Sequence, residues 1–228
     1  MKLLLCILAI STAFQAFGQQ QQVTAGLYFS RFQASQEFRQ QITRHPIGGA
    51  IVVLYSPDSS RWHYGIELGI GLHSGKKYFY HTADVGRPDN IDYIYEENGF
   101  LYYHLVSRYM VLQSSQVLPY AELRFGASSF FSAIRTMEYS DVVEDRFQFD
   151  DTVLSGYAGV GISLDVGGIW GQAWRRKLML DGGGGYLISS QATYRNSVKH
   201  IMISSFQEGQ RTSGANAWHF KLGVNLVF

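Results

Sequence analysis

The sequence predicts an all-β protein, an eight-stranded antiparallel up-and-down transmembrane β-barrel. Three observations support this: segments of alternating apolar and polar residues recur, a secretory leader precedes them, and the connections alternate between short and long. The alternation is clear in residues 218–228, where a period of two separates an apolar face from a polar or small one. The apolar face comprises Trp218, Phe220, Leu222, Val224, Leu226 and Phe228. One face suits lipid and the other suits water.

Residues 1–18 have the pattern of a signal peptide. Lys2 precedes a short apolar run, and Ala16-Phe17-Gly18 places small residues at positions −3 and −1 of a cleavage site. We therefore expect a signal peptide over 1–18 and a barrel domain over 19–228. The run is shorter than the ~20 residues of a spanning helix. Cys6 is the only cysteine, so the mature chain is expected to lack disulfides, thiol nucleophiles and cysteine metal sites.

The charge balance favours no polyanionic partner. The chain has 19 basic and 18 acidic residues, and loss of Lys2 with the leader would leave these charges equal. We expect no nucleic-acid binding. Beyond the leader no continuous apolar stretch approaches transmembrane-helix length, so residence in a membrane would require a closed barrel.

The first three strands are expected at residues 23–32, 48–55 and 62–73. The third alternates without a break, with Trp62, Ile66 and Leu72 among its apolar positions and glycines, histidines and Glu67 between them. A helix would scatter these apolar residues around its circumference.

Five further strands are expected at residues 100–112, 119–134, 152–165, 177–191 and 218–228. His104 and Arg108 lie on the polar face of the fourth, Glu122 and Arg124 on that of the fifth, and Asp181 on that of the seventh. Pro119 is tolerated because it is the first residue of its strand. The run of four glycines at 182–185 predicts a tightly curved strand, because no lysine-serine or lysine-threonine pair follows to make a phosphate loop.

The connections indicate an orientation. Those after the second, fourth and sixth strands are short, and the others are long. Outer-membrane barrels have short periplasmic turns and longer external loops, so both termini are expected in the periplasm. Five aromatic residues are expected at the membrane interfaces: Trp62, Trp170, Trp174, Trp218 and Phe228. At ~3.3 Å per residue and ~40° tilt, Trp218 and Phe228 would lie ~25 Å apart along the membrane normal.

The inward faces predict a charged network that fills the lumen. Its expected members are Glu67, Arg108 and Glu122 on consecutive strands, Arg124 one dyad higher, and Asp181 beside Lys221. Eight strands leave room only for side chains or one small ligand. We expect a satisfied plug with no catalytic residue, cofactor or metal. His63 and His73 lie ~33 Å apart along their strand, too far to share a metal.

Residues 119–127, 156–162 and 220–228 resemble strands of the outer-membrane β-barrel domain family that includes PorT-like proteins. The resemblance implies an eight-stranded barrel in a Gram-negative outer membrane, with roles from structural protein to secretion-system component. Phe228 resembles the assembly signal read by the barrel-assembly machinery. Outer-membrane lipid, lipopolysaccharide and an envelope protein are the other expected partners.

The resulting hypothesis is a non-enzymatic outer-membrane barrel that acts through its long external loops. One alternative is a lipid-modifying barrel enzyme, for which Ser204, His200 and Glu208 could supply a triad only by spacing. Another is a secreted lipocalin-like carrier, which would need a polar outer face where residues 62–72 are apolar.

Overall fold

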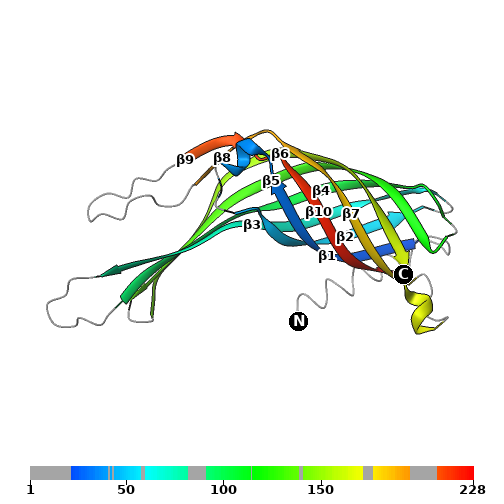
Figure 1. Ribbon diagram of the computed structural model, residues 1–228, viewed down its shortest axis with the longest axis horizontal. Helices are drawn as coiled ribbons and strands as arrows, with labels where there is room; N and C mark the ends of the chain where they lie inside the picture. The colour runs from blue at the N-terminus through cyan, green and yellow to red at the C-terminus, as the bar shows by residue number, and fades with distance from the viewer. Residues whose placement is uncertain are drawn as a thin grey trace.

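Eight antiparallel strands close into a barrel, which confirms the expected fold class (Figure 1). The computed structural model describes residues 22–40, 42, 44–57, 60–81, 91–113, 115–138, 141–171, 177–195 and 210–228. The expected signal peptide lies outside this range. Around the barrel the order is β1-β10-β7-β6-β5-β4-β3-β2. The strands are β1 (Gln22–Ala34), β2 (Ile47–Ser56), β3 (Trp62–His81), β4 (Ile91–Met110), β5 (Val117–Glu138), β6 (Asp141–Asp165), β7 (Leu178–Ser189) and β10 (Ala217–Val227).

Four smaller elements lie at the ends of the barrel. Helix α2 (Gln36–Arg39) follows β1, and β8 (Gln191–Arg195) pairs with β9 (Gln210–Gly214) in a separate two-stranded sheet. Both belong to the end with the long connections. A short 3₁₀ helix, η1 (Gly167–Trp170), lies between β6 and β7 at the other end. No helix in the described ranges is long and apolar enough to cross a membrane.

The pairing register fixes the tilt of the strands. A path across neighbouring strands runs Gln33↔Trp218↔Tyr186↔Ala158↔Leu123↔Ser107↔Tyr64↔Tyr55↔Val23. It begins and ends on β1, at residues 33 and 23, so the barrel has a stagger of ten residues. With ~3.3 Å per residue and ~4.8 Å between strands, this stagger gives a tilt of about 40°. Each residue then advances about 2.5 Å along the barrel axis.

Four strands extend beyond the range that their alternation predicts. β3 and β4 remain paired to His81 and Ile91, and β5 and β6 to Glu138 and Asp141. Register shifts at Leu72/Ser74 and Phe130/Phe131 mark where the extensions begin. The alternation of apolar and polar residues in the sequence fades beyond these shifts. We call this extension the outer sheet: residues 74–81, 91–98, 131–138 and 141–149.

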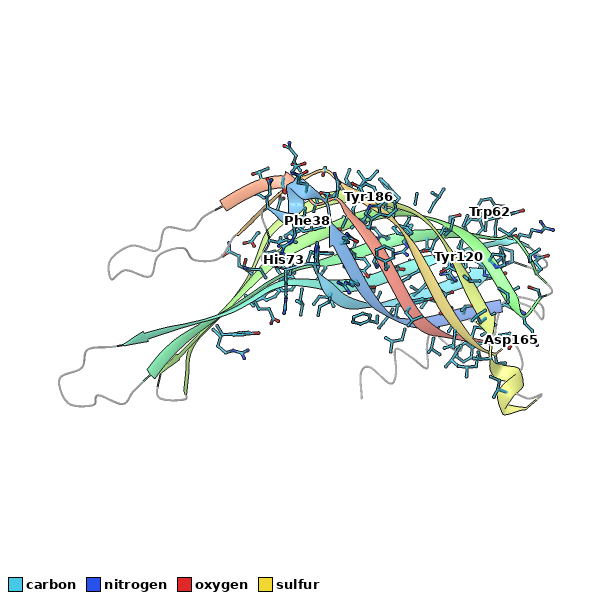
Figure 2. All side chains as sticks on the ribbon, in the orientation of Figure 1. Phe38, Trp62, His73, Tyr120, Asp165 and Tyr186 are labelled. Carbon is cyan, nitrogen blue, oxygen red and sulfur yellow. The ribbon has the colours of Figure 1, made fainter. Side chains whose placement is uncertain are left out.

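The polarity of the barrel is inverted relative to a soluble protein. Apolar side chains on all eight strands point outward and remain exposed, as at Leu27, Leu105, Leu123 and Leu222, which are 60–67% exposed. Six charged side chains point inward and are buried: Glu67, Arg108, Glu122, Arg124, Asp181 and Lys221. Figure 2 shows the side chains on the ribbon, with Tyr120 within the barrel region and Trp62 near one rim.

Candidate functional site: the charged lumen

Six charged residues on five strands meet inside the barrel, and their formal charges cancel. The cations are Arg108 on β4, Arg124 on β5 and Lys221 on β10; the anions are Glu67 on β3, Glu122 on β5 and Asp181 on β7. Each is at most 5% exposed. All six lie at inward positions because the side-chain period of a strand is two. The structure thus brings together every residue of the expected lumen network.

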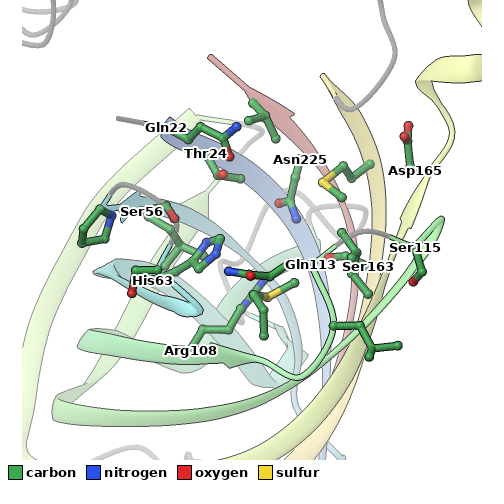
Figure 3. Close-up of a pocket in the computed structure, with 18 residues that line it drawn as sticks. Gln22, Thr24, Ser56, His63, Arg108, Gln113, Ser115, Ser163, Asp165 and Asn225 are labelled. Atoms are coloured by element: carbon green, nitrogen blue, oxygen red, sulfur yellow. The ribbon is translucent and has the colours of Figure 1, made fainter. Parts of the chain in front are cut away.

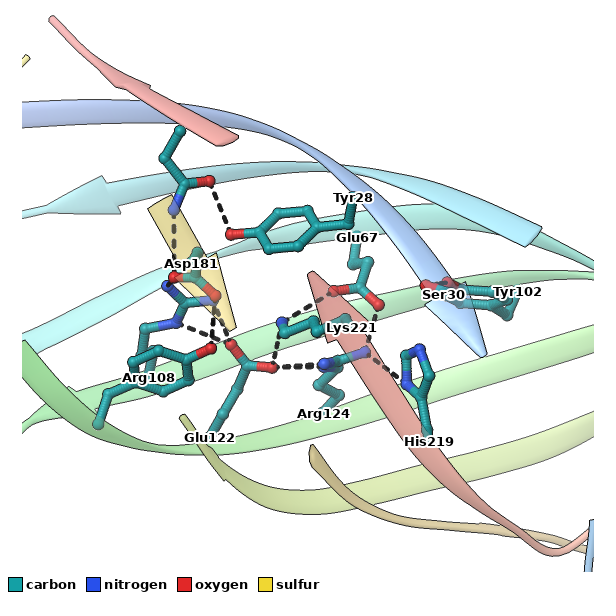
Figure 4. Close-up of polar contacts among 12 residues, drawn as sticks. Tyr28, Ser30, Glu67, Tyr102, Arg108, Glu122, Arg124, Asp181, His219 and Lys221 are labelled. Carbon is teal, nitrogen blue, oxygen red and sulfur yellow. Dashed lines mark hydrogen bonds and ion pairs between the residues drawn. The ribbon is translucent and has the colours of Figure 1, made fainter. Parts of the chain in front are cut away.

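Glu122 is the centre of the network (Figure 4). Its Oε2 accepts from Arg108 Nε at 2.8 Å, and its Oε1 accepts from Arg124 Nε at 2.7 Å and Lys221 Nζ at 2.8 Å. Glu67 pairs with Arg124 and lies 3.6 Å from Lys221 Nζ. One carboxylate therefore contacts all three cations.

Asp181 makes a different contact from the expected one. Its Oδ2 accepts from Arg108 Nη1 at 2.9 Å across the lumen, whereas Lys221 pairs with Glu122 and Glu67. The register explains the difference, since Lys221 lies opposite Gly183 and Asp181 lies opposite Gly223. Sequence alone does not show how far an arginine reaches across a barrel.

Neutral polar groups complete the coordination of Asp181. Its oxygens accept from Tyr120 Oη at 2.6 Å, Ser163 Oγ at 2.6 Å and Asn225 Nδ2 at 3.2 Å. Tyr28 in turn donates to Asn225 Oδ1 at 2.7 Å. These donors satisfy the hydrogen-bonding capacity of the buried carboxylate. These partners were missed by the sequence analysis, although the strand phase places Tyr120 on the same face as Glu122.

Aromatic rings cover the cations. The guanidinium carbon of Arg108 lies 4.0 Å from the centroid of Tyr120, and that of Arg124 lies 3.9 Å from Tyr157. Lys221 Nζ lies 4.8 Å from the centroid of Tyr28. Cation–π contacts of this kind stabilise a desolvated cation. The network is therefore packed as well as paired.

The end of the lumen with the long connections is closed by aromatic residues. Phe32 stacks on His219 with 4.2 Å between ring centroids and meets Phe100 edge-on at 5.2 Å. Above them Phe38 of α2, 1% exposed, packs against Phe130 at 6.4 Å. The hydroxyl of Ser35 accepts from Phe38 N and begins the helix. The helix therefore places an apolar side chain across this end.

The opposite end contains a cavity of about 400 Å³ (Figure 3). Arg108, Asn225 and Ser163 contribute to it from the network, and His63, Ser56 and Gln113 line it further out. The lumen is thus asymmetric, with a polar recess at the short-turn end and an aromatic cap at the other. Charged and aromatic side chains lie between the two.

The predicted interface aromatics lie in different places. Trp62 is exposed, stacks on Tyr64 and contacts Tyr109 with 5.0 Å between centroids, near the short turns. Trp218 is exposed near the other rim, 5.2 Å from Tyr186. Phe228 is exposed, and its N and O atoms bond with Val23. Trp170 lies in η1, and Trp174 lies outside the described residues.

The three residues of the enzyme alternative, His200, Ser204 and Glu208, lie outside the described part of the chain. Within the described ranges no group of three or more histidine, cysteine or acidic side chains is placed to hold a metal.

No family model and no curated protein matches the chain. Solved structures with a similar fold include Neisserial surface protein A, 12% identical over 90% of this chain and 96% of that one, with a TM-score of 0.47. A major outer membrane protein from Thermus thermophilus is 12% identical over 92% of this chain and 100% of that one, with a TM-score of 0.46. Ail of Yersinia pestis is 12% identical over 92% of this chain and 100% of that one, with a TM-score of 0.40. These values are too low to transfer a function or a site residue.

Proposed function

We propose that the chain is a non-enzymatic integral protein of a bacterial outer membrane. Its plugged barrel would anchor the outer sheet and α2 at the cell surface, where they contact an envelope partner. The observation that carries this proposal is the inverted polarity: an apolar outer face on all eight strands around a buried charged network. A soluble monomer rarely exposes an apolar patch larger than a few hundred Å².

The dimensions of the apolar face fit one bilayer. In the barrel part of β6, residues 152–165, exposed apolar positions run from Leu154 to Leu164, and ten residues at about 2.5 Å of axial rise span ~25 Å. Trp62 and Trp218 lie near opposite ends of this band. The height matches the apolar band of outer-membrane barrels, with aromatic residues at both interfaces.

The lumen supports a structural role. The six charges are engaged with one another, and the aromatic cap lies above them. Of the six, Arg108 alone lines the cavity, and its guanidinium is held by Glu122 and Asp181. The apolar exterior argues against a lipocalin-like carrier, whose outer face meets water.

We also propose a direction of insertion in the membrane. The short turns and residues 22 and 228 lie at one end, which we place in the periplasm together with the cavity. The outer sheet would then face the exterior, as external loops of outer-membrane barrels do. Phe228 is proposed as the residue recognised by the barrel-assembly machinery, and lipid with lipopolysaccharide as the surroundings of the band.

Single-cysteine labelling tests location and direction together. In a Cys6→Ala background, Gly86→Cys lies in the long β3–β4 connection and Ser59→Cys in the short β2–β3 turn. A membrane-impermeant maleimide should label only Gly86→Cys in intact cells and both in lysed cells. The folded band should also migrate faster before boiling than after it. Recovery in the soluble fraction, or labelling of Ser59→Cys alone in intact cells, would refute the proposal.

A further inference from the structure

We propose that the barrel binds the phosphate group of an outer-leaflet lipid at its external rim, where β1 and β10 lie side by side (Figure 1). The polar residues assigned to this site are Arg31, Gln33 and His45, and Phe220 lies beside the acyl chains. The inference rests on the proposed function for two points: the apolar face lies in a membrane, and the end with the long connections faces the exterior.

Arg31 interrupts the apolar outer face of the barrel. Its side chain is exposed and follows Leu27 and Phe29 at the outward positions of β1. Within the barrel, the outward positions of the eight strands all belong to the described residues, and no other one of them is charged. A charge on the lipid face is costly, and the cost is lowest near an interface. Arg31 is therefore expected to lie close to water or to an anion.

The register places Arg31 at the external edge of the apolar band. Gln33 lies directly opposite Trp218, the exposed aromatic residue near that rim. Arg31 is two residues nearer the middle of the band, which is about 5 Å along the barrel axis. A long cationic side chain at this depth extends its charged end to the interface. The guanidinium of Arg31 thus reaches the headgroups of the outer leaflet.

A cavity of about 440 Å³ lies beside Arg31, and we call it the rim cavity. It is lined by Arg31, Gln33, His45 and Phe220. Arg31 and Gln33 are both exposed and point to the same side of β1, because they are two residues apart. Neither side chain forms an ion pair or hydrogen bond within the described part of the chain. Both are therefore available to a ligand.

His45 supplies a further donor to the rim cavity. Its Nδ1 accepts from Ala34 N at 3.1 Å, so the hydrogen of the neutral ring lies on Nε2. A guanidinium, an amide and an imidazole N–H thus line one cavity. A phosphate group carries negative charge and three strong acceptor oxygens, and arginine binds it with two parallel hydrogen bonds. The charge and the number of donors both fit phosphate.

The surface next to the rim cavity fits the acyl chains of the same molecule. Phe220 lies directly opposite Arg31, and Leu222 lies opposite Phe29, one dyad nearer the middle of the band. Phe29 and Leu222 are 58% and 67% exposed. A free phosphate ion would contact the polar residues alone, whereas a phosphate-bearing lipid contacts both surfaces. This continuity favours a lipid as the ligand.

A glycine on β7 keeps the rim cavity open. Phe220 has Arg31 on one side and Gly184 on the other. A Cβ at Gly184 would lie only 2.9 Å from Phe220 Cδ1, so the ring leans over the bare backbone of β7. The ring is therefore directed away from Arg31, and space remains between β10 and β1.

Native mass spectrometry of the full chain, folded in a neutral detergent, tests the headgroup contact. The probe is lipid A with its phosphates, and the comparison probe is the same lipid after phosphatase treatment. The wild type should prefer the phosphorylated probe, and Arg31→Leu should lower its affinity by about tenfold or more through loss of charge-assisted hydrogen bonds. Leucine is common on the outward face, so this variant should fold. Arg61→Leu, at an exposed arginine of the opposite end, is the matched control and should bind as the wild type does.

Closure of the rim cavity provides an independent readout that leaves every charge in place. Gly184→Ala should turn the Phe220 ring toward Arg31 and weaken binding of the phosphorylated probe. Gly182→Ala is the control on the same strand, because the atom nearest to its Cβ would be Leu222 Cδ1 at 3.6 Å. It should leave the affinity unchanged.

Three results would overturn the lipid site: equal binding of the two lipid A probes, wild-type affinity in Arg31→Leu, or wild-type affinity in Gly184→Ala. Displacement of the lipid by an equal concentration of inorganic phosphate would overturn the choice of a lipid as the ligand. The heat shift of the wild type separates this site from the proposed function. A wild-type chain without a heat shift would refute the membrane assignment, whereas a folded barrel that binds no lipid A would refute the lipid site alone.

Discussion

Arg108 and Glu122 occupy directly opposed positions on β4 and β5, and Arg108 Nε donates to Glu122 Oε2 at 2.8 Å. The same carboxylate also contacts Arg124 and Lys221. The side chain of Glu122 therefore links β4 to β5 and neutralises charge from all three cations of the lumen.

Replacement of Glu122 should be severe. Glu122→Gln keeps the shape but leaves three buried cations with two carboxylates, and loss of one partner from a buried pair costs about 3–5 kcal/mol. The free energy of unfolding would be measured by urea titration of the folded band in lipid vesicles. Glu97→Gln, in the outer sheet, is the control and should change it little. A loss below about 1 kcal/mol for Glu122→Gln would show that the network does not stabilise the barrel.

Removal of an oppositely charged pair should lower the free energy of unfolding by less than the sum of the two single losses. Lys221 Nζ lies 3.6 Å from Glu67 Oε2, so Glu67→Gln and Lys221→Met each leave a net charge in the lumen and together leave none. We expect a favourable coupling energy of about 1–3 kcal/mol in a double-mutant cycle. The same urea titration measures all four proteins. Strict additivity would mean that the two groups act independently.

The cost of a charged side chain on the outward face should depend on its depth in the membrane. Leu123 and Leu164 are both exposed on neighbouring strands, but the register places Leu123 near mid-height and Leu164 near the short-turn rim. Leu123→Arg should cost about 2–4 kcal/mol and Leu164→Arg about 0–1 kcal/mol in a bilayer. Equal costs from unfolding titrations in vesicles would contradict the proposed position of the membrane.

Two glycines should differ in their tolerance of a methyl group. A Cβ at Gly126 would lie 2.0 Å from the carbonyl oxygen of Tyr103, whereas the nearest atom at Gly156 is 3.6 Å away. Gly126→Ala must therefore displace the backbone of β4, and overpacking of this kind costs about 1–3 kcal/mol. Gly156→Ala is the control. We expect a lower unfolding midpoint for Gly126→Ala alone, and similar midpoints would exclude steric constraint at Gly126.

The sequence predicts the barrel well because lipid imposes a strict period. Trp62, Ile66 and Leu72 alternate with inward residues, and the observed strand has that phase. The outer sheet was partly missed because apolar and polar residues do not alternate regularly in residues 91–98 and 141–149.

The members of the charged lumen follow from strand phase, but their partners do not. Asp181 and Lys221 lie on adjacent strands, yet Asp181 binds Arg108 from the far wall. Contacts across a lumen depend on stagger and side-chain length, which local pattern does not contain. The cap by Phe38 depends on a four-residue helix that is too short to show a period.

The seam between β1 and β10 has a kinetic consequence. Val23 and Phe228 exchange two backbone hydrogen bonds, of 3.3 and 2.8 Å, although the other barrel strands lie between them in the chain. Contacts of such long sequence separation form slowly, because the entropy of loop closure must be overcome first. Until the seam forms, β1 and β10 are open edges able to pair with foreign strands. The period before closure is thus the time at which this chain is most exposed to aggregation.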